Sequence, residues 1–180
     1  MNLEAVLRHY HLHHRPRHDH ELTWFRTQAS LEDALRVAGK AQDDGGKRYC
    51  HQRRIKPEAI TEATKRLVEL HDDLRRCSTF HTLWALIRDN LKPIRGIGDL
   101  YIYDAALRIG AYLRLTPERV YLHAGTRIGA RKSGLLLRAG GRREWLEPNE
   151  LPAPLRGLPP SDVENLLCIY EGRLPRLECT

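Results

Sequence analysis

Apolar residues recur at helical spacing along most of this 180-residue chain. A clear stripe consists of Ile60, Ala63, Leu67, Leu70 and Leu74, which fall on one helix face because residues three and four positions apart are neighbours there. Alternation of apolar and polar residues, which is typical of a half-buried strand, is nearly lacking. The sequence therefore predicts a mainly α fold with a compact helical domain, a Gly/Arg/Pro-rich C-terminal segment and a final short helix.

Residues that favour helix ends divide these stripes into separate elements. Ser30 with Asp33 indicates the start of one helix, and Pro57 indicates the start of the next. Further helices are expected over 79–91 and 99–113. The remaining start signals are Thr116-Pro117-Glu118, expected to begin a helix that carries Val120, Tyr121 and Leu122, and Ser161-Asp162-Val163-Glu164, expected to be a capping box for a helix ending near Gly172.

Composition along the chain indicates three regions. Residues 1–29 are expected to be a histidine-rich arm, in which Pro16 disfavours a regular helix. Residues 30–131 are expected to form the helical domain. Residues 132–180 are expected to be a basic, proline-rich segment and a C-terminal helix that packs on the same domain.

The chain is basic, with 30 Lys and Arg against 23 Asp and Glu and a formal net charge of +7. Of these cations, 24 are Arg and six are Lys. Arginine favours bidentate contacts with phosphate, so double-stranded DNA is the first partner to consider. A GC-rich genome would also favour arginine codons, and composition alone leaves both explanations open.

Other classes of protein are disfavoured. No apolar run approaches the roughly 18 residues of a membrane helix, so no membrane partner is expected. The start of the chain is rich in histidine and does not resemble a signal peptide. The cysteines are scattered without paired spacing, which indicates reduced thiols and a cytoplasmic location; they are Cys50, Cys77, Cys168 and Cys179.

The most specific local pattern is Ile94-Arg95-Gly96-Ile97-Gly98, between two amphipathic helices. Two glycines allow a sharp turn, and the second leads directly into a helix N-terminus. Backbone N–H groups and the helix dipole there favour a phosphate oxygen. The two isoleucines are expected to hold the turn on the core. A glycine-containing turn without a ligand is the alternative.

The segment Leu91–Gly98, with its flanking helices over 80–113, resembles the helix-hairpin-helix motif of DNA-binding proteins. The resemblance extends, over about residues 60–131, to helix-hairpin-helix DNA glycosylases. It implies contacts of the hairpin with the DNA backbone, made by Lys92, Arg95, Gly96, Ile97 and Gly98. The chain departs from the glycosylases at two places: His123 stands where they have a catalytic Asp, and Leu100 where the bifunctional members have a lysine.

A glycosylase of this kind needs a carboxylate near the sugar, because the reaction passes through an oxocarbenium-like state. Asp104 and Asp99 are the nearest candidates. Asp104 could instead form an ordinary helical ion pair with Arg108, and Asp99 could complement a helix N-terminus. His123 is a third candidate, as a base or hydrogen-bond donor, although a structural histidine is the simpler interpretation.

Two further segments could contact DNA. Tyr49, His51, Gln52 and Arg53 offer stacking and hydrogen-bonding groups for an extruded base, or they form a solvated loop. The stretch 127–143 holds six cations and no acid. Its candidates for contact with the DNA backbone are Arg127, Arg131 and Lys132.

Metal binding by the N-terminal histidines is disfavoured. His14 and His18 have helical spacing, but Pro16 lies between them. We therefore expect no metal and no cofactor. The leading hypothesis is a monofunctional DNA glycosylase-like hydrolase that flips and excises a damaged or modified base, in repair or in antiviral defence. The alternatives are a non-catalytic helix-hairpin-helix DNA-binding module and, more weakly, a metal-dependent nuclease.

Overall fold

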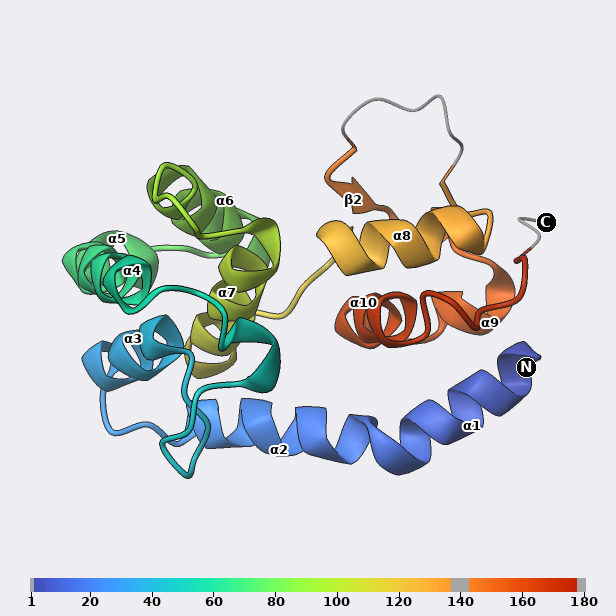
Figure 1. The fold of residues 1–180 in the computed structure, drawn as a ribbon, viewed down its shortest axis with the longest axis horizontal. Coiled ribbons are helices and arrows are strands. Elements are labelled where there is room, and N and C mark those ends of the chain that lie inside the picture. Colours follow the sequence, from blue (N-terminus) through green and yellow to red (C-terminus); the bar gives the residue numbers. More distant parts are fainter. Residues whose placement is uncertain (1, 137–142, 178–180) are drawn as a thin grey trace. The chain divides into compact units, whose positions relative to one another are not determined.

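The computed structural model describes residues 2–136 and 143–177, and it confirms a mainly α fold (Figure 1). Ten α-helices and one two-stranded sheet lie in these ranges. No helix in them is both long and apolar enough to span a membrane. The chain divides into two compact units, of which the first combines residues 1–17 with 117–180 and the second is the continuous segment 18–116.

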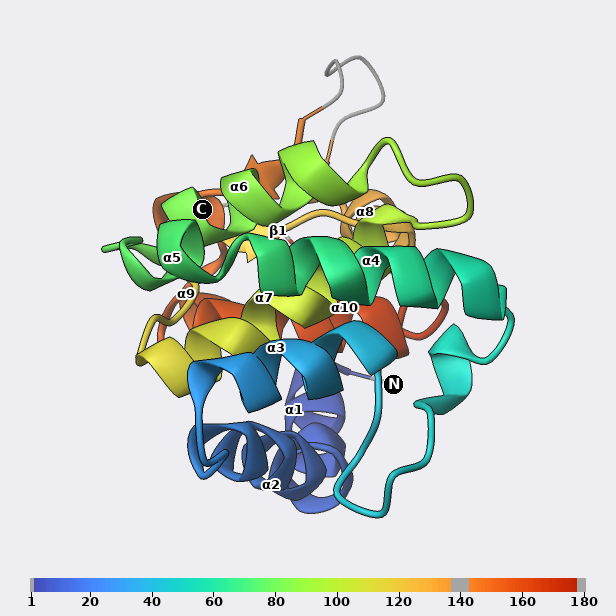
Figure 2. The same ribbon diagram turned by 90° about the vertical axis from the view of Figure 1, so that its left-hand side faces the viewer.

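The second unit is built from helices that pack side by side (Figure 2). Contacts join α3 to α4 and α7, and α6 to α4 and α7. Its elements are α2 (Arg15–Arg26, which begins just before the unit), α3 (Leu31–Lys40), the 3-10 turn η1 (Cys50–Gln52), α4 (Pro57–Glu69), α5 (His71–Arg75), α6 (Phe80–Leu91) and α7 (Asp99–Leu113).

Helix starts in the second unit follow the sequence signals closely. The Ser30 side chain accepts a hydrogen bond from the Asp33 backbone N–H at 3.0 Å and caps α3. Pro57 is the first residue of α4, where its missing N–H costs nothing. Helices α6 and α7 cover the expected ranges 79–91 and 99–113 within one residue. The predicted helices from Ser30, Pro57, Thr79 and Asp99 are therefore confirmed.

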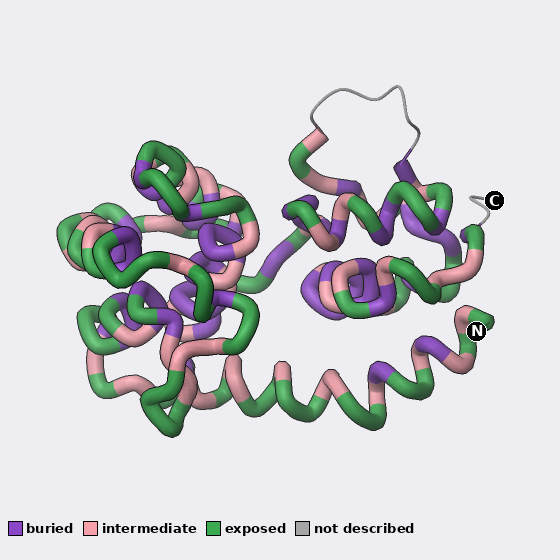
Figure 3. Tube along the Cα trace, viewed as in Figure 1, coloured by how far each residue is buried: buried purple, intermediate pink, exposed green. Residues whose placement is uncertain are grey.

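Small residues let the helices of the second unit approach closely. A Cβ on Gly39 of α3 would lie 2.8 Å from the Cα of Thr64 on α4, so only glycine fits that crossing. The Gly39 carbonyl also accepts a hydrogen bond from the Tyr101 hydroxyl of α7. Buried positions line the inner faces of these helices, as the purple segments of Figure 3 show. The Tyr101 hydrogen bond joins α7, which carries the candidate site, to α3.

The first unit has its own apolar core. Its elements are α1 (Leu3–His13), β1 (Val120–Tyr121), α8 (Ala124–Lys132), β2 (Trp145–Leu146), the 3-10 turn η2 (Pro148–Glu150), α9 (Ala153–Arg156) and α10 (Pro160–Ile169). The core gathers residues from both ends of the chain, including Val6, Tyr10, Val163 and Leu167. Helices α8 and α10 cross so closely that a Cβ on Gly129 would overlap the Leu167 carbonyl oxygen, at 1.9 Å.

The expected helix from Thr116 is wrong. Val120 and Tyr121 form strand β1, which pairs antiparallel with Trp145 and Leu146. Both β1 residues are buried, and their β-branched and aromatic side chains suit a strand. The partner strand lies some twenty-five residues further along the chain, so local start signals could not reveal the pairing.

The N-terminal region is helical, contrary to the expected irregular arm. Helix α1 ends at His13, and Pro16 is the second residue of α2. Proline is tolerated in the first turn of a helix, so Pro16 marks a boundary between two helices. The expected capping box at 161–164 is also wrong, because the helix begins earlier, at Pro160, and Glu164 is buried.

Two reciprocal hydrogen bonds cap the N-terminus of α6. The Thr79 side chain accepts from the Thr82 backbone N–H at 3.1 Å, and the Thr82 hydroxyl accepts from the Thr79 backbone N–H at 3.3 Å. We expect Thr79→Ala to lower the free energy of unfolding by about 1 kcal/mol, the usual value of a helix N-cap. Urea denaturation measures it. Thr61→Ala, on an exposed face of α4, should change little, and equal losses in both variants would contradict the capping role.

Candidate functional site

The turn between α6 and α7 places two glycines directly before the N-terminus of α7. Gly96 has a φ of +96°, a left-handed conformation that favours glycine. Ile94 and Ile97 are buried at 8% and 7% exposure, as expected, and hold the turn on the second unit. Gly98 precedes α7 in an extended conformation, and among the described residues no side chain caps this helix N-terminus.

The surface of this turn is open. A Cβ on Gly98 would meet no described atom within 4 Å, and a Cβ on Gly96 would meet only the Ala59 side chain, at 3.8 Å. Lys92 and Arg95 are exposed beside the glycines. The Lys92 ammonium pairs with the Asp99 carboxylate across the turn. The negative charge nearest to the helix N-terminus is thus balanced, and the backbone can be approached from solvent.

Asp104, one of the predicted catalytic residues, lies against the segment predicted to recognise a base. Its Oδ2 accepts a hydrogen bond from Gln52 Nε2 at 2.5 Å and contacts His51 Nε2 at 2.8 Å. The Asp104 side chain is 15% exposed, whereas that of His51 is 47% exposed. The structure therefore brings together two groups of candidate residues that are about fifty positions apart in the sequence.

Arg108 anchors this network from the inside. Its Nε donates to Glu21 Oε1 at 2.8 Å, its Nη1 donates to Gln52 Oε1 at 3.3 Å, and its Nη2 lies 3.9 Å from Asp104 Oδ2. Its guanidinium carbon lies 3.9 Å from the centre of the Tyr49 ring. Burial alone would lower the pKa of Arg108, but the negative charges of Asp104 and Glu21 outweigh this effect and raise the pKa above its ordinary value. The guanidinium therefore stays charged.

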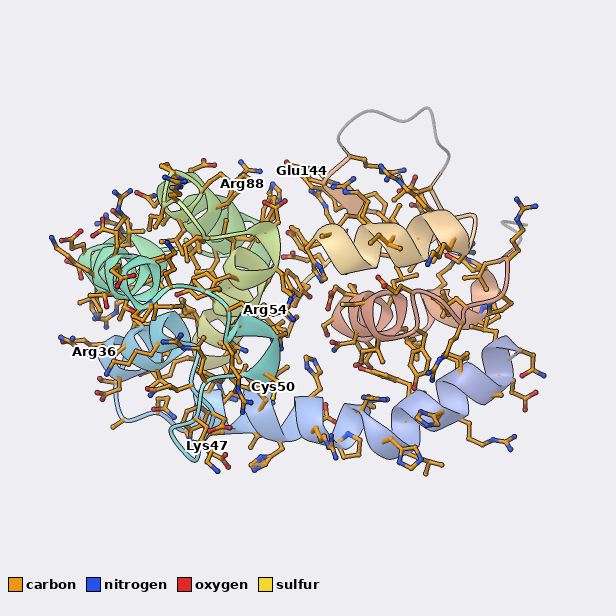
Figure 4. All side chains as sticks on the ribbon, in the orientation of Figure 1. Arg36, Lys47, Cys50, Arg54, Arg88 and Glu144 are labelled. Atoms are coloured by element: carbon orange, nitrogen blue, oxygen red, sulfur yellow. The ribbon has the colours of Figure 1, made fainter. Side chains whose placement is uncertain are left out.

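The four predicted base-recognition residues therefore occupy different environments. Tyr49 is half-buried against Arg108, and burial raises the pKa of its hydroxyl. Gln52 is 1% exposed, and both ends of its amide are bonded within the network. His51 and Arg53 are exposed and remain accessible to a ligand. Neighbouring Cys50 and Arg54 are labelled in Figure 4, which marks where this segment lies.

His123, the third catalytic candidate, belongs to the first unit and is 3% exposed. It precedes α8, and its Nε2 contacts the Glu164 carboxylate of α10. Thr126 Oγ1 lies 2.7 Å from His123 Nε2 and donates to Glu164 Oε1 at 2.8 Å. Burial lowers the pKa of His123, but hydrogen bonds and charge from Cys168 and Glu164 raise it to about 10.

The predicted cationic residues of the first unit lie on α8. Arg127 Nη2 donates to the Leu122 carbonyl at 3.0 Å, so this side chain is partly engaged by the fold. Arg131 and Lys132 are exposed in the last turn of the helix, where cations favour the C-terminal dipole. The part of the basic stretch at 137–142 lies outside the described residues.

Within residues 2–136 and 143–177, one group of three His, Cys, Asp or Glu side chains is close enough to hold a metal ion. It consists of His123, Glu164 and Cys168, and includes none of the N-terminal histidines. Of those, His9 Nδ1 lies 2.7 Å from the Tyr170 hydroxyl, and its ring centre is 4.4 Å from that of His13.

Several of these functional candidates were not predicted from the sequence. Glu21, Thr126, Glu164 and Cys168 all interact with predicted residues or with Arg108. The spacing of four between Glu164 and Cys168 was the available signal, since it places both on one face of a helix. Comparison of the chain with family models, curated proteins and solved structures gives no match.

Proposed function

We propose that this chain binds duplex DNA through the α6–α7 turn and hydrolyses the N-glycosidic bond of a flipped base. The observation that carries the proposal is the open turn itself. A helix N-terminus without a side-chain cap follows two glycines whose surroundings are nearly empty, and Lys92 and Arg95 lie exposed beside it. A phosphate oxygen at this position would accept hydrogen bonds from backbone N–H groups and gain from the helix dipole. In a helix-hairpin-helix interpretation, this is the contact with the DNA backbone.

Asp104 lies on α7, the helix that this turn begins, and is the carboxylate that we assign to the hydrolytic step. Asp104 follows Asp99 by five residues on α7, about 7.5 Å along the helix axis at 1.5 Å per residue. In this proposal Asp104 contacts the sugar of the flipped nucleotide. There it would stabilise the oxocarbenium-like state and orient a water molecule. In this proposal Gln52 and Arg108 hold Asp104, while exposed His51 and Arg53 face the extruded base.

A non-catalytic DNA-binding module is the second candidate. The observation in its favour is that Asp104 Oδ2 already accepts one hydrogen bond from Gln52, contacts His51 and lies near Arg108. A carboxylate with these contacts can stabilise the fold without taking part in a reaction. The two candidates share the DNA-binding turn and differ only in whether Asp104 reacts.

A panel of labelled duplexes tests the activity. Unmodified, damaged and phage-type modified duplexes are incubated with the full chain and then treated with alkali, which breaks the strand at abasic sites. Alkali-dependent breaks on one class of duplex, with EDTA present, would support the glycosylase and identify its base. Binding without breaks on every duplex would leave the non-catalytic module as the function. Neither binding nor breaks would overturn both.

Gly96→Glu tests the DNA-binding turn. The added carboxylate would face the phosphate, so we expect the affinity for duplex DNA to fall at least about tenfold, or about 1.4 kcal/mol. Electrophoretic mobility shift at fixed salt concentration measures it, because such affinities depend strongly on salt.

The matched control for this prediction is Gly46→Glu. Gly46 also has a positive φ, of +70°, with no described atom within 4 Å of a Cβ, and it lies in the loop between α3 and α4. The Gly46→Glu substitution therefore introduces the same charge and a comparable backbone strain in the same unit. Equal affinities of the two variants for duplex DNA would remove the α6–α7 turn from the proposed interface.

A further inference from the structure

The polar cluster inside the first unit is built from two helices that meet closely. His123 lies immediately before α8, while Glu164 and Cys168 lie one turn apart on α10. One ligand atom of each residue lies within 4.8 Å of the ligand atoms of the other two. The side chains of His123 and Glu164 are 2% and 5% exposed, and Cys168 is half-buried. Three groups that can each ligate a metal are thus gathered where α8 and α10 meet.

Glycines make this arrangement possible. A Cβ on Gly125 would lie 2.9 Å from Cys168 Sγ and 3.6 Å from His123 Cε1, so any larger residue would press on the cluster. Gly129, one turn later, allows α8 to approach the backbone of α10 at Leu167. The donors are therefore carried by, or directly adjoin, two helices at close approach, which is the rigid support that a defined ligand geometry requires.

The combination of donor atoms favours one kind of ion. Calcium and magnesium take oxygen ligands almost exclusively, which excludes them for a site with a thiol and an imidazole. Zinc accepts cysteine sulfur, histidine nitrogen and carboxylate oxygen in a tetrahedral arrangement. With bonds of about 2.0–2.3 Å, tetrahedral zinc ligands lie about 3.3–3.7 Å apart, within the limit that the three donors already satisfy. A thiolate and a carboxylate also supply two negative charges, which balance a divalent cation.

Thr126 lies within hydrogen-bond distance of two of the three proposed ligands. Its hydroxyl oxygen lies 2.7 Å from His123 Nε2 and bonds Glu164 Oε1 at 2.8 Å. Hydrogen-bonded neighbours of this kind orient metal ligands and contribute to the affinity. A bound ion would separate His123 from Glu164, and a water molecule would complete the fourth position.

We propose that His123, Glu164 and Cys168 form a zinc site that joins α8 to α10. The proposal concerns the first unit alone and does not depend on DNA binding by the second. Its test uses no DNA, so it can fail or succeed separately from the proposed function.

The experiment measures metal binding by the full chain after removal of metal with EDTA. Zinc is titrated in competition with a coloured chelator, and cobalt(II) is added separately as a spectroscopic probe. We expect one equivalent of zinc per chain and a thiolate-to-cobalt charge-transfer band in the near ultraviolet. Cys168→Ser should remove the band, and Thr126→Val should weaken zinc binding about 10–100-fold, as loss of an outer neighbour typically does.

Cys77→Ser is the matched control, because Cys77 belongs to the second unit and to no metal-binding group of the described residues. It should retain both the band and the affinity. A charge-transfer band that survives Cys168→Ser, or the lack of any band in the unsubstituted chain, would overturn the proposal. Binding by the N-terminal histidines alone would give cobalt no thiolate band and would count as the second of these outcomes.

A second measurement does not require the variants to fold. Iodoacetamide alkylation of Cys168 in the unsubstituted chain is followed by peptide mass spectrometry, with and without zinc. We expect zinc to slow the modification of Cys168 at least about tenfold and to leave that of Cys77 unchanged. Rapid alkylation of Cys168 that zinc does not slow would instead indicate a thiol activated by His123, and the metal site would be rejected.

Discussion

Replacing Arg108 with methionine will lower the free energy of unfolding of the 18–116 unit by about 3 kcal/mol. Arg108 is 2% exposed and contacts Glu21, Gln52 and Asp104. Methionine can occupy the space of the aliphatic stem but cannot balance the two carboxylates. Removing one partner from a buried ion network typically costs about 3–5 kcal/mol. Because Glu21 and Asp104 retain 26% and 15% exposure, we expect the lower end of that range.

The measurement is urea denaturation of the full chain, combined with peptide-resolved hydrogen exchange to assign the loss to residues 18–116. The control is Arg36→Met on α3. Arg36 also pairs with a glutamate, Glu32, but both side chains are about half exposed, so the loss should stay below about 0.5 kcal/mol. If the two variants lose equal stability, then the Arg108 network does not hold Asp104 in place.

The sequence patterns were most informative where residues close in the sequence determine the end of a helix or a turn. Helix α3 begins after Ser30 because that side chain bonds the Asp33 backbone N–H, and both residues are visible in the sequence. The α6–α7 turn likewise follows from two glycines and two isoleucines within five positions. Capping and turn preferences are local, so a local pattern suffices to predict them.

The patterns failed where distant contacts decide the structure. Val120 and Tyr121 follow a helix-start signal, yet pairing with Trp145 and Leu146 makes them a strand. Ser161 and Glu164 match a capping box, yet Pro160 begins the helix and Glu164 is directed to His123. In both cases a buried tertiary contact outweighs a local preference of about 1 kcal/mol.

In the candidate sites, too, the sequence indicated single residues but not the distant contacts between them. Asp104 and the segment Tyr49–Arg53 were each singled out as residue types suited to chemistry. Their mutual contact depends on a loop and a helix that meet only in the folded unit. His123 was a candidate base, with a structural histidine as the simpler interpretation, and it lies in a buried cluster with Glu164 and Cys168. Two of these three donors share one face of α10, but His123 lies before another helix, and sequence spacing does not predict that the two helices meet.

We expect Asp104→Asn to reduce base release by about 10²–10⁴-fold on the duplex that the unsubstituted chain cleaves, which is the usual contribution of a positioned acid–base group. Asparagine keeps the shape of the side chain and can still accept the hydrogen bond from Gln52. It removes the negative charge that would stabilise a cationic sugar. The proposed contacts with the DNA backbone lie at the α6–α7 turn, so affinity for duplex should change less than threefold, about 0.6 kcal/mol.

The role of Asp104 follows from comparing base release with DNA affinity and with stability in the Asp104→Asn variant. Asp104→Asn also removes a charge beside Arg108, so a structural role would appear as lost stability together with lost binding. The control Asp73→Asn removes an exposed carboxylate from α5 in the same unit and should leave release and binding unchanged. Full release by Asp104→Asn would exclude Asp104 as the reacting carboxylate. Loss of release with unchanged affinity and an unchanged urea midpoint would require that Asp104 acts in the reaction itself, since neither the fold nor the DNA contact would have altered.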